Sequence, residues 1–116
     1  MRRGEIWTIS SGGDFTGKPR PALVIHDDRY QSKTAATFLP LTTTFSQPSM
    51  LRVGLEPTTL NGLREASAVQ VNRIAIVKLD KVGKRLGRLD ETTMAEVDRA
   101  LAAYLGLTGR GAEGQA

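Results

Sequence analysis

Short segments rich in β-forming residues, separated by loops that contain Gly and Pro, fill most of the chain before a single amphipathic helix. The segments cover residues 4–10, 21–26, 35–42, 50–56 and 66–72, and residues 74–77 continue or restart the last one. Pro40 lies inside the third segment, which predicts a bulge or an edge position there. Many short strands without intervening helices argue against a parallel βαβ sheet. The pattern predicts a mainly β (α+β) fold, a small antiparallel barrel capped by a helix.

The capping helix has clear start and stop signals. Asp90 is a favourable N-cap, and Gly106 is typical of the residue just beyond a helix end. Apolar side chains recur at steps of three and four between these limits and predict one buried stripe, made by Met94, Val97, Leu101 and Tyr104.

The length of 116 residues fits one domain. We assign residues 1–107 to the folded body and the Gly-rich residues 108–116 to a flexible C-terminal tail. No apolar run approaches the ~20 residues of a membrane span, and the N-terminus lacks the apolar core of a signal peptide. We therefore expect a cytoplasmic protein.

The residue inventory excludes several kinds of chemistry. The chain has no Cys, which removes disulfides, thiol nucleophiles and zinc knuckles. It has one His, His26, so a catalytic pair of imidazoles within one chain is impossible. We expect His26 to be structural or on the surface, and we predict no metal and no cofactor. The net charge of +4 suits a polyanionic partner, although it is also compatible with simple solubility.

The loop of residues 12–21 is the most informative segment. Its glycines let backbone N–H groups approach an anion closely. Lys18 adds charge beside them, and Pro19 and Pro21 restrict the backbone of Arg20 on both sides. This arrangement suits a phosphate clamp, and a plain surface hairpin with a solvated arginine is the alternative.

Two other features fit a nucleic-acid partner without requiring one. Thr42, Thr43 and Thr44 end the third segment, where their hydroxyls could bind phosphate or simply favour a strand and turn. Phe15 and Phe45 lie in predicted loops, where they could stack on unpaired bases or fold back onto the core.

The ordered motifs resemble the MazF/PemK toxin family. Arg3-Gly4-Glu5-Ile6-Trp7, followed by a Gly-rich loop and residues 17–25, is similar to the opening of these toxins. The similarity continues over most of residues 2–107, through four further segments: Pro40-Leu41-Thr42, residues 61–67, Asn72-Arg73-Ile74 and residues 85–89 before the helix.

This resemblance implies a homodimeric, SH3-like barrel (CcdB/PemK-like) that acts as an endoribonuclease toxin. Such toxins cut single-stranded RNA at short sequences without a metal ion, leaving 2′,3′-cyclic phosphate and 5′-OH ends. A cognate antitoxin peptide inhibits them by occupying the RNA groove. Carried over by position, Arg20 and Thr42 match the catalytic arginine and threonine. The expected RNA-binding residues are Phe15, Gly17, Lys18, Thr43, Thr44 and Arg73.

Two positions depart from the family pattern. Asp14 stands where some members have a serine, and Arg73 stands where some have a glutamine. Arg20 is expected to stabilise charge on the phosphorane, because a guanidinium stays protonated and is a poor base. The general base stays open, with Asp14 as a possible catalytic residue. Two alternatives remain at this point, a CcdB-like gyrase-binding toxin and a non-catalytic SH3-like RNA-binding module.

Overall fold

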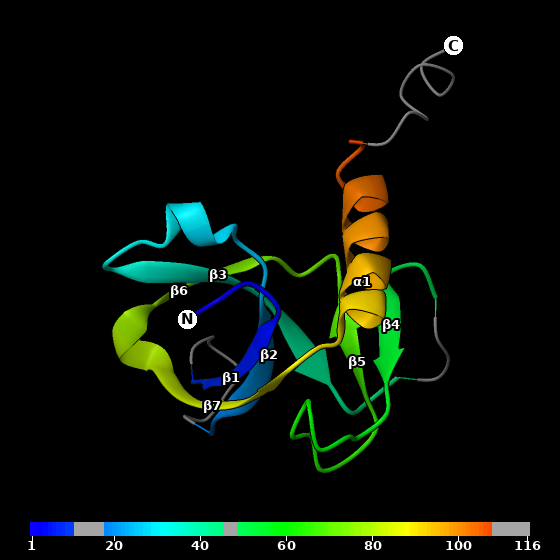
Figure 1. Cartoon of the computed structure of the whole chain (residues 1–116), viewed down its shortest axis with the longest axis horizontal. Coiled ribbons are helices and arrows are strands. Elements are labelled where there is room, and N and C mark those ends of the chain that lie inside the picture. Colours follow the sequence, from blue (N-terminus) through cyan, green and yellow to red (C-terminus); the bar gives the residue numbers. More distant parts are fainter. Residues whose placement is uncertain (11–17, 46–48, 108–116) are drawn as a thin grey trace.

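The computed structural model describes residues 1–10, 18–45 and 49–107, so Asp14, Phe15, Gly17 and the tail 108–116 lie outside the described residues. Within them the chain is mainly β-sheet with one C-terminal helix, as the sequence predicts (Figure 1). The elements in chain order are β1 (Glu5–Ile9), β2 (Arg20–Val24), η1 (Asp28–Tyr30), β3 (Ala35–Thr42), β4 (Arg52–Leu55), β5 (Ser67–Gln70), β6 (Ala75–Lys78), η2 (Leu79–Lys81), β7 (Val82–Arg88) and α1 (Glu91–Tyr104).

All of the strand pairs are antiparallel. The strands follow the order β4-β5-β3-β2-β1-β7, and β6 pairs with β3 off this path. Strand β7 lies at one end of the strand order, whereas β6 pairs with β3. Because η2 joins β6 directly to β7, the sheet must curl to bring these two strands near one another. Among the described residues no ladder between β6 and β7 closes the sheet.

Strand β3 is central, which makes the expected edge position of Pro40 wrong. One side of β3 pairs with β2, and the other pairs first with β6 and then with β5. The β6 ladder ends at Phe38 and the β5 ladder begins at Leu41, so Pro40 lies in the gap between them. Its carbonyl accepts a hydrogen bond from Gln70 on that side. Because N and C=O of one strand residue face the same edge, the missing N–H of Pro40 falls where no ladder bond is needed.

Strand β7 is absent from the prediction, which treated residues 78–87 only as a basic segment. The strand has no alternating apolar pattern, and Gly87 is its one buried residue. It forms because β1 offers a partner edge, with Glu5 opposite Arg88 and Ile9 opposite Val82. Pairing with a distant strand has here outweighed the weak β-propensity of residues 82–88.

The core has two parts, one on each face of the sheet. The larger cluster includes Leu23, Leu39 and Val69 and is covered by α1 through Val97 and Ala100. Figure 1 shows α1 beside β4 and β5. The smaller cluster, centred on Phe38 and Val24, fills the inside of the curl. Strands β2 and β3 are buried on both faces, which fixes their register.

The predicted helix limits are confirmed. The Asp90 side chain accepts a hydrogen bond from the backbone N of Thr93 at 2.7 Å. At the other end Gly106 has φ of 73°, and the N–H groups of Gly106 and Leu107 bond to Ala103 and Ala102, a Schellman cap. The stripe is buried through Val97 and partly through Met94 and Leu101, but Tyr104 is 47% exposed.

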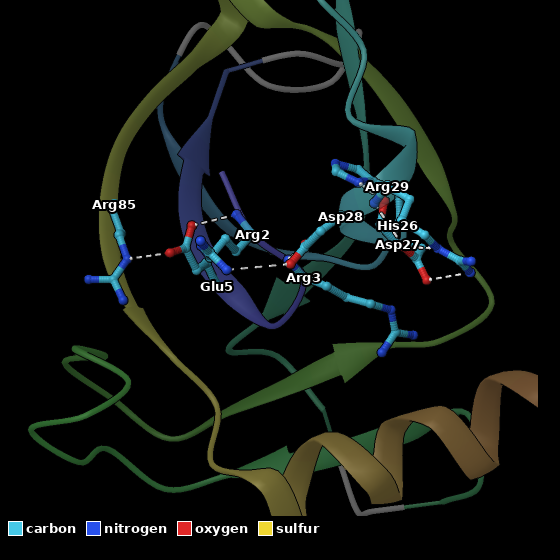
Figure 2. A network of polar contacts seen from close by, with 8 residues as sticks. All are labelled: Arg2, Arg3, Glu5, His26, Asp27, Asp28, Arg29 and Arg85. Atoms are coloured by element: carbon cyan, nitrogen blue, oxygen red, sulfur yellow. Dashed lines mark hydrogen bonds and ion pairs between the residues drawn. The ribbon is translucent and has the colours of Figure 1, made fainter.

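The N-terminal family motif is structural in this fold. The Arg3 side chain donates from Nε to the Ile25 carbonyl at 2.8 Å and forms an ion pair with Asp98 of α1 at 2.6 Å. The Gly4 N–H donates to Val24. Figure 2 shows Glu5 between Arg2 and Arg85. The motif therefore joins the first strand to β2, β7 and α1.

We predict that Gly62→Ala destabilises the fold by about 2–4 kcal/mol, combining backbone strain with overpacking. Gly62 has φ of 68°, and an added Cβ would overlap the carbonyl oxygen of Leu86. Denaturant unfolding measures the effect. Gly54→Ala is the matched control, since a Cβ there meets nothing within 4 Å. Equal stabilities of the two variants would contradict the prediction.

We predict that Glu5→Gln costs about 1–3 kcal/mol of stability at neutral pH. Burial raises the pKa of Glu5, but hydrogen bonds from the Arg2 backbone N–H, Trp7 Nε1 and Arg85 outweigh it and hold the pKa below its usual 4.5. The ionised group is therefore stabilising above the unfolded-state pKa, and this contribution is lost as pH falls through the lower folded-state pKa.

Thermal unfolding of wild type and Glu5→Gln across this range tests the linkage. The stability gap between the two proteins should shrink as the pH falls below 4.5. A gap that stays constant down to the most acidic pH at which wild type folds would show that the Glu5 charge contributes nothing.

Candidate nucleic-acid interface

The register of β2 and β3 brings two predicted site residues together. Ala22 lies opposite Pro40 in this antiparallel pair. Continuing the register by two residues places Arg20 opposite Thr42, and alternation puts both side chains on one face. On its other side Thr42 pairs with Ala68 of β5.

A hollow of about 260 Å³ lies at this point, which we call the Arg20 pocket. Residues from β2, the end of β3, β5 and the turn after β5 line it. They are Arg20, Pro21, Leu41, Thr42, Thr43, Ser67, Gln70 and Arg73. Four of them, Arg20, Thr42, Thr43 and Arg73, are site residues that the sequence analysis expected.

The hydroxyl of Thr42 is held in place by its own turn. Its Oγ1 accepts the Thr44 N–H at 3.0 Å and donates its own hydrogen to the Thr44 carbonyl at 3.3 Å. Thr42 is half-buried, whereas Thr43 and Thr44 are exposed. Thr44 does not line the pocket and serves the turn that positions Thr42. The turn role that the sequence allowed for the threonine triplet is thus confirmed, and Thr42 and Thr43 also line the pocket.

A second hollow of about 420 Å³ continues from the first, and we call it the basic groove. The two share Arg20, Pro21, Thr43 and Ser67. The cationic side chains lining the basic groove are Lys18, Arg20, Arg64 and Lys84. Glu65 is the one carboxylate among the described residues that line either hollow. A surface of this charge suits a phosphodiester chain.

A third hollow, of about 210 Å³, has the opposite character. It lies near the start of α1, and three carboxylates face one cation there, Glu56, Asp90 and Glu96 against Arg88. A polyanion would be repelled from most of this surface. The Arg20 pocket and the basic groove together are therefore the candidate site.

Sequence reasoning missed several of the lining residues. The sequence analysis took Gln70 only as part of a strand, and it took Arg64 and Ser67 only as parts of the family-like segment 61–67 or of the strand that follows, with no role in the site. Lys84 belongs to the basic segment that was not assigned as a strand. The β3–β5 register, which no local pattern reveals, is what brings Ser67 and Gln70 beside Thr42.

The remaining predicted features lie apart from the site. His26 is half-buried at the end of β2, with Nδ1 at 3.2 Å from the Asp27 carbonyl. Phe45 is half-buried and lines neither hollow. In the described part of the chain, no group of three or more His, Cys, Asp or Glu side chains could hold a metal ion. Within the same residues, no helix has the length and apolar character needed to cross a membrane.

Residues 2–105 match the family described as "PemK-like, MazF-like toxin of type II toxin-antitoxin system". The chain belongs to this family. It is 41% identical to a probable endoribonuclease MazF of Mycolicibacterium smegmatis, over 94% of this chain and 100% of that protein. It is 28% identical to endoribonuclease MazF9 of Mycobacterium tuberculosis, over 92% of this chain and 98% of that protein.

Solved structures of MazF proteins share the fold. A mycobacterial endoribonuclease in complex with its cognate antitoxin superposes with a TM-score of 0.72 at 24% identity, covering 93% of this chain and 97% of that one. MazE–MazF from Deinococcus radiodurans superposes with a TM-score of 0.73 at 23% identity, with the same coverages. The MazF-like assignment and the MazF-like fold are thus confirmed.

Proposed function

We propose that this MazF-like protein is a cytoplasmic endoribonuclease toxin that cleaves single-stranded RNA at a short sequence and is neutralised by a cognate antitoxin. The observation that carries the proposal is the meeting of Arg20 and Thr42 in one pocket that opens into a basic groove. The relatives with similar sequences are endoribonucleases, and their similarity spans nearly the whole chain.

The proposed reaction is a transesterification within the RNA. The 2′-oxygen attacks the adjacent phosphorus, the bond to the 5′-oxygen breaks, and the products are a 2′,3′-cyclic phosphate and a 5′-OH. The 2′-OH proton passes to a general base, and the leaving oxygen takes up a proton. No metal ion is needed if protein groups stabilise the charge that builds on the non-bridging oxygens.

In this mechanism Arg20 faces the developing charge. Its guanidinium is permanently cationic and offers several N–H donors in a fixed plane. A donor aimed at charge that appears only in the transition state lowers the barrier more than it tightens ground-state binding. The one O–H of Thr42 would turn from the Thr44 carbonyl to donate to a non-bridging oxygen, or its Oγ1 would accept from the attacking hydroxyl.

The other assignments remain proposals. Asp14 is the proposed general base, and Phe15 and Gly17 are proposed RNA contacts; all three lie outside the described residues. Lys18, Thr43 and Arg73 line the two hollows and would bind phosphates along the strand. Thr44 acts through the turn that holds Thr42.

We predict that Arg20→Ala lowers the cleavage rate about 100- to 1,000-fold, the usual loss for one transition-state donor. The assay uses purified protein and single-stranded RNA in EDTA, with end analysis for cyclic phosphate. Arg29→Ala is the matched control, because Arg29 is exposed, pairs with Asp27 and lines neither hollow. Equal rates for wild type and Arg20→Ala would remove Arg20 from the mechanism.

The same assay separates the competing functions. Salt-sensitive binding with RNA that stays intact would indicate a non-catalytic RNA-binding module. Gyrase-dependent DNA breaks without RNA cleavage would indicate a CcdB-like toxin. Cleavage that disappears in EDTA and returns with a divalent cation would contradict the metal-independent mechanism.

We also propose that the active form is a homodimer and that the antitoxin occupies the RNA groove. Three exposed apolar side chains near the end of α1, Tyr104, Leu105 and Leu107, offer surface for self-association. The net positive groove suits an acidic peptide as well as RNA. Both proposals extend the family assignment.

Sedimentation with labelled RNA tests both points. We expect twice the chain mass at micromolar protein, and release of the RNA when the cognate antitoxin is added. A monomer would contradict the dimer. A ternary complex of toxin, RNA and antitoxin would show that the antitoxin binds elsewhere.

A further inference from the structure

Gln70 lies at an unusual point of the sheet. It is the last residue of β5 and lines the Arg20 pocket together with Arg20 and Thr42. The β3–β5 ladder covers only Leu41 with Val69 and Thr42 with Ala68. Continuing that register places Gln70 opposite Pro40, where the ladder has stopped.

The Gln70 amide is anchored at this gap. Its Nε2 donates to the Pro40 carbonyl at 3.4 Å. A carbonyl can only accept, so the amide nitrogen rather than the amide oxygen faces Pro40. This bond uses one of the two N–H groups and neither lone pair of Oε1. One donor and one acceptor of a half-buried, oriented amide thus remain for another partner.

The turn after β5 holds Gln70 beside Arg73. The Arg73 N–H donates to the Gln70 carbonyl at 3.1 Å, which closes a four-residue turn. Arg52 braces the turn through a 2.7 Å hydrogen bond from Nη1 to Asn72 Oδ1. Gln70 and Arg73 are both among the lining residues of the Arg20 pocket.

The pocket also offers a buried hydroxyl. Ser67 is 3% exposed, and its Oγ donates to the Glu65 carbonyl at 3.0 Å, which leaves its lone pairs to accept. Arg20 and Arg73 suit phosphate, whereas a neutral amide and a neutral hydroxyl suit the edge of a nucleobase, which carries donors and acceptors but no charge. Both kinds of group line the same pocket, with Arg20 on β2 and Ser67, Gln70 and Arg73 on β5 and the turn after it.

We infer that Gln70 is a specificity-determining residue, whose amide recognises the base of a nucleotide next to the phosphate bound by Arg20. The inference rests on the proposed function, because it assigns to Gln70 the recognition of a base at the same RNA-binding site. A base edge with a donor next to an acceptor, such as N6 and N7 of adenine, can pair with both free groups of the amide.

The test compares wild type with Gln70→Leu on a short single-stranded RNA library with a randomised stretch. Sequencing of the cleaved ends gives the base preference at each position. We expect Gln70→Leu to weaken the preference about tenfold at one position next to the cut and to leave the others unchanged. Gln31→Leu is the matched control, because Gln31 is exposed and lines neither hollow.

A second arm measures binding of the same library with 2′-fluoro groups, which cannot undergo the cleavage. Gln70→Met, which nearly keeps the side-chain volume without the amide, replaces Gln70→Leu if the latter fails to fold. Identical preferences for wild type and the folded Gln70 variant overturn the inference. If the preferences are identical and wild type still cleaves RNA, the proposed function stands and only the role of Gln70 is overturned. If wild type does not cleave RNA, the proposed function is overturned, and the binding arm decides whether Gln70 recognises a base. Wild type that binds none of the oligonucleotides overturns both.

Discussion

The antiparallel pairing of β2 with β3 is the constraint on which the site depends. Both strands are buried on two faces, by Leu23 and Leu39 in one core cluster and by Val24 and Phe38 in the other. A slip of one residue would exchange the side chains of a strand between the two faces, so that residues such as Leu23 and Val24 would enter core sites shaped for other side chains. The two core clusters therefore fix the register, and the register places Arg20 opposite Thr42. Core packing in this way determines the position of the proposed catalytic pair.

The pocket forms beside a break in the pairing of β3. Strand β3 changes partner from β6 to β5, and Pro40 at the change has no N–H to leave unsatisfied. The Gln70 side chain, rather than a backbone ladder, meets the Pro40 carbonyl. Because no backbone ladder occupies this edge of β3 at Pro40, the edge is open to side chains and to a ligand. The proline that was predicted to mark a bulge or an edge thus lies at the break in pairing beside the pocket.

The sequence was most informative where structure depends on neighbours in the chain. The cap residues Asp90 and Gly106 act within a few residues of themselves, and both were predicted correctly. Strand β7 depends on the distant edge of β1, and its local pattern gave no signal. Arg20 and Thr42 came from family resemblance, since no local pattern pairs residues of two strands. Gln70 was missed because its importance arises from the β3–β5 register and the gap at Pro40.

The charge of the chain acquires meaning only once it is placed on the fold. Among the described residues, the two joined hollows hold five cations, Lys18, Arg20, Arg64, Arg73 and Lys84, against the carboxylate of Glu65. The other eleven Lys and Arg residues and the other eleven Asp and Glu residues, Asp14 among them, cancel in the formal net charge of +4. Pairs such as Arg3 with Asp98 and Arg85 with Glu5 belong to this balanced set and serve the fold. A modest net charge can therefore accompany a strongly basic groove, because attraction of a polyanion depends on where the charges gather.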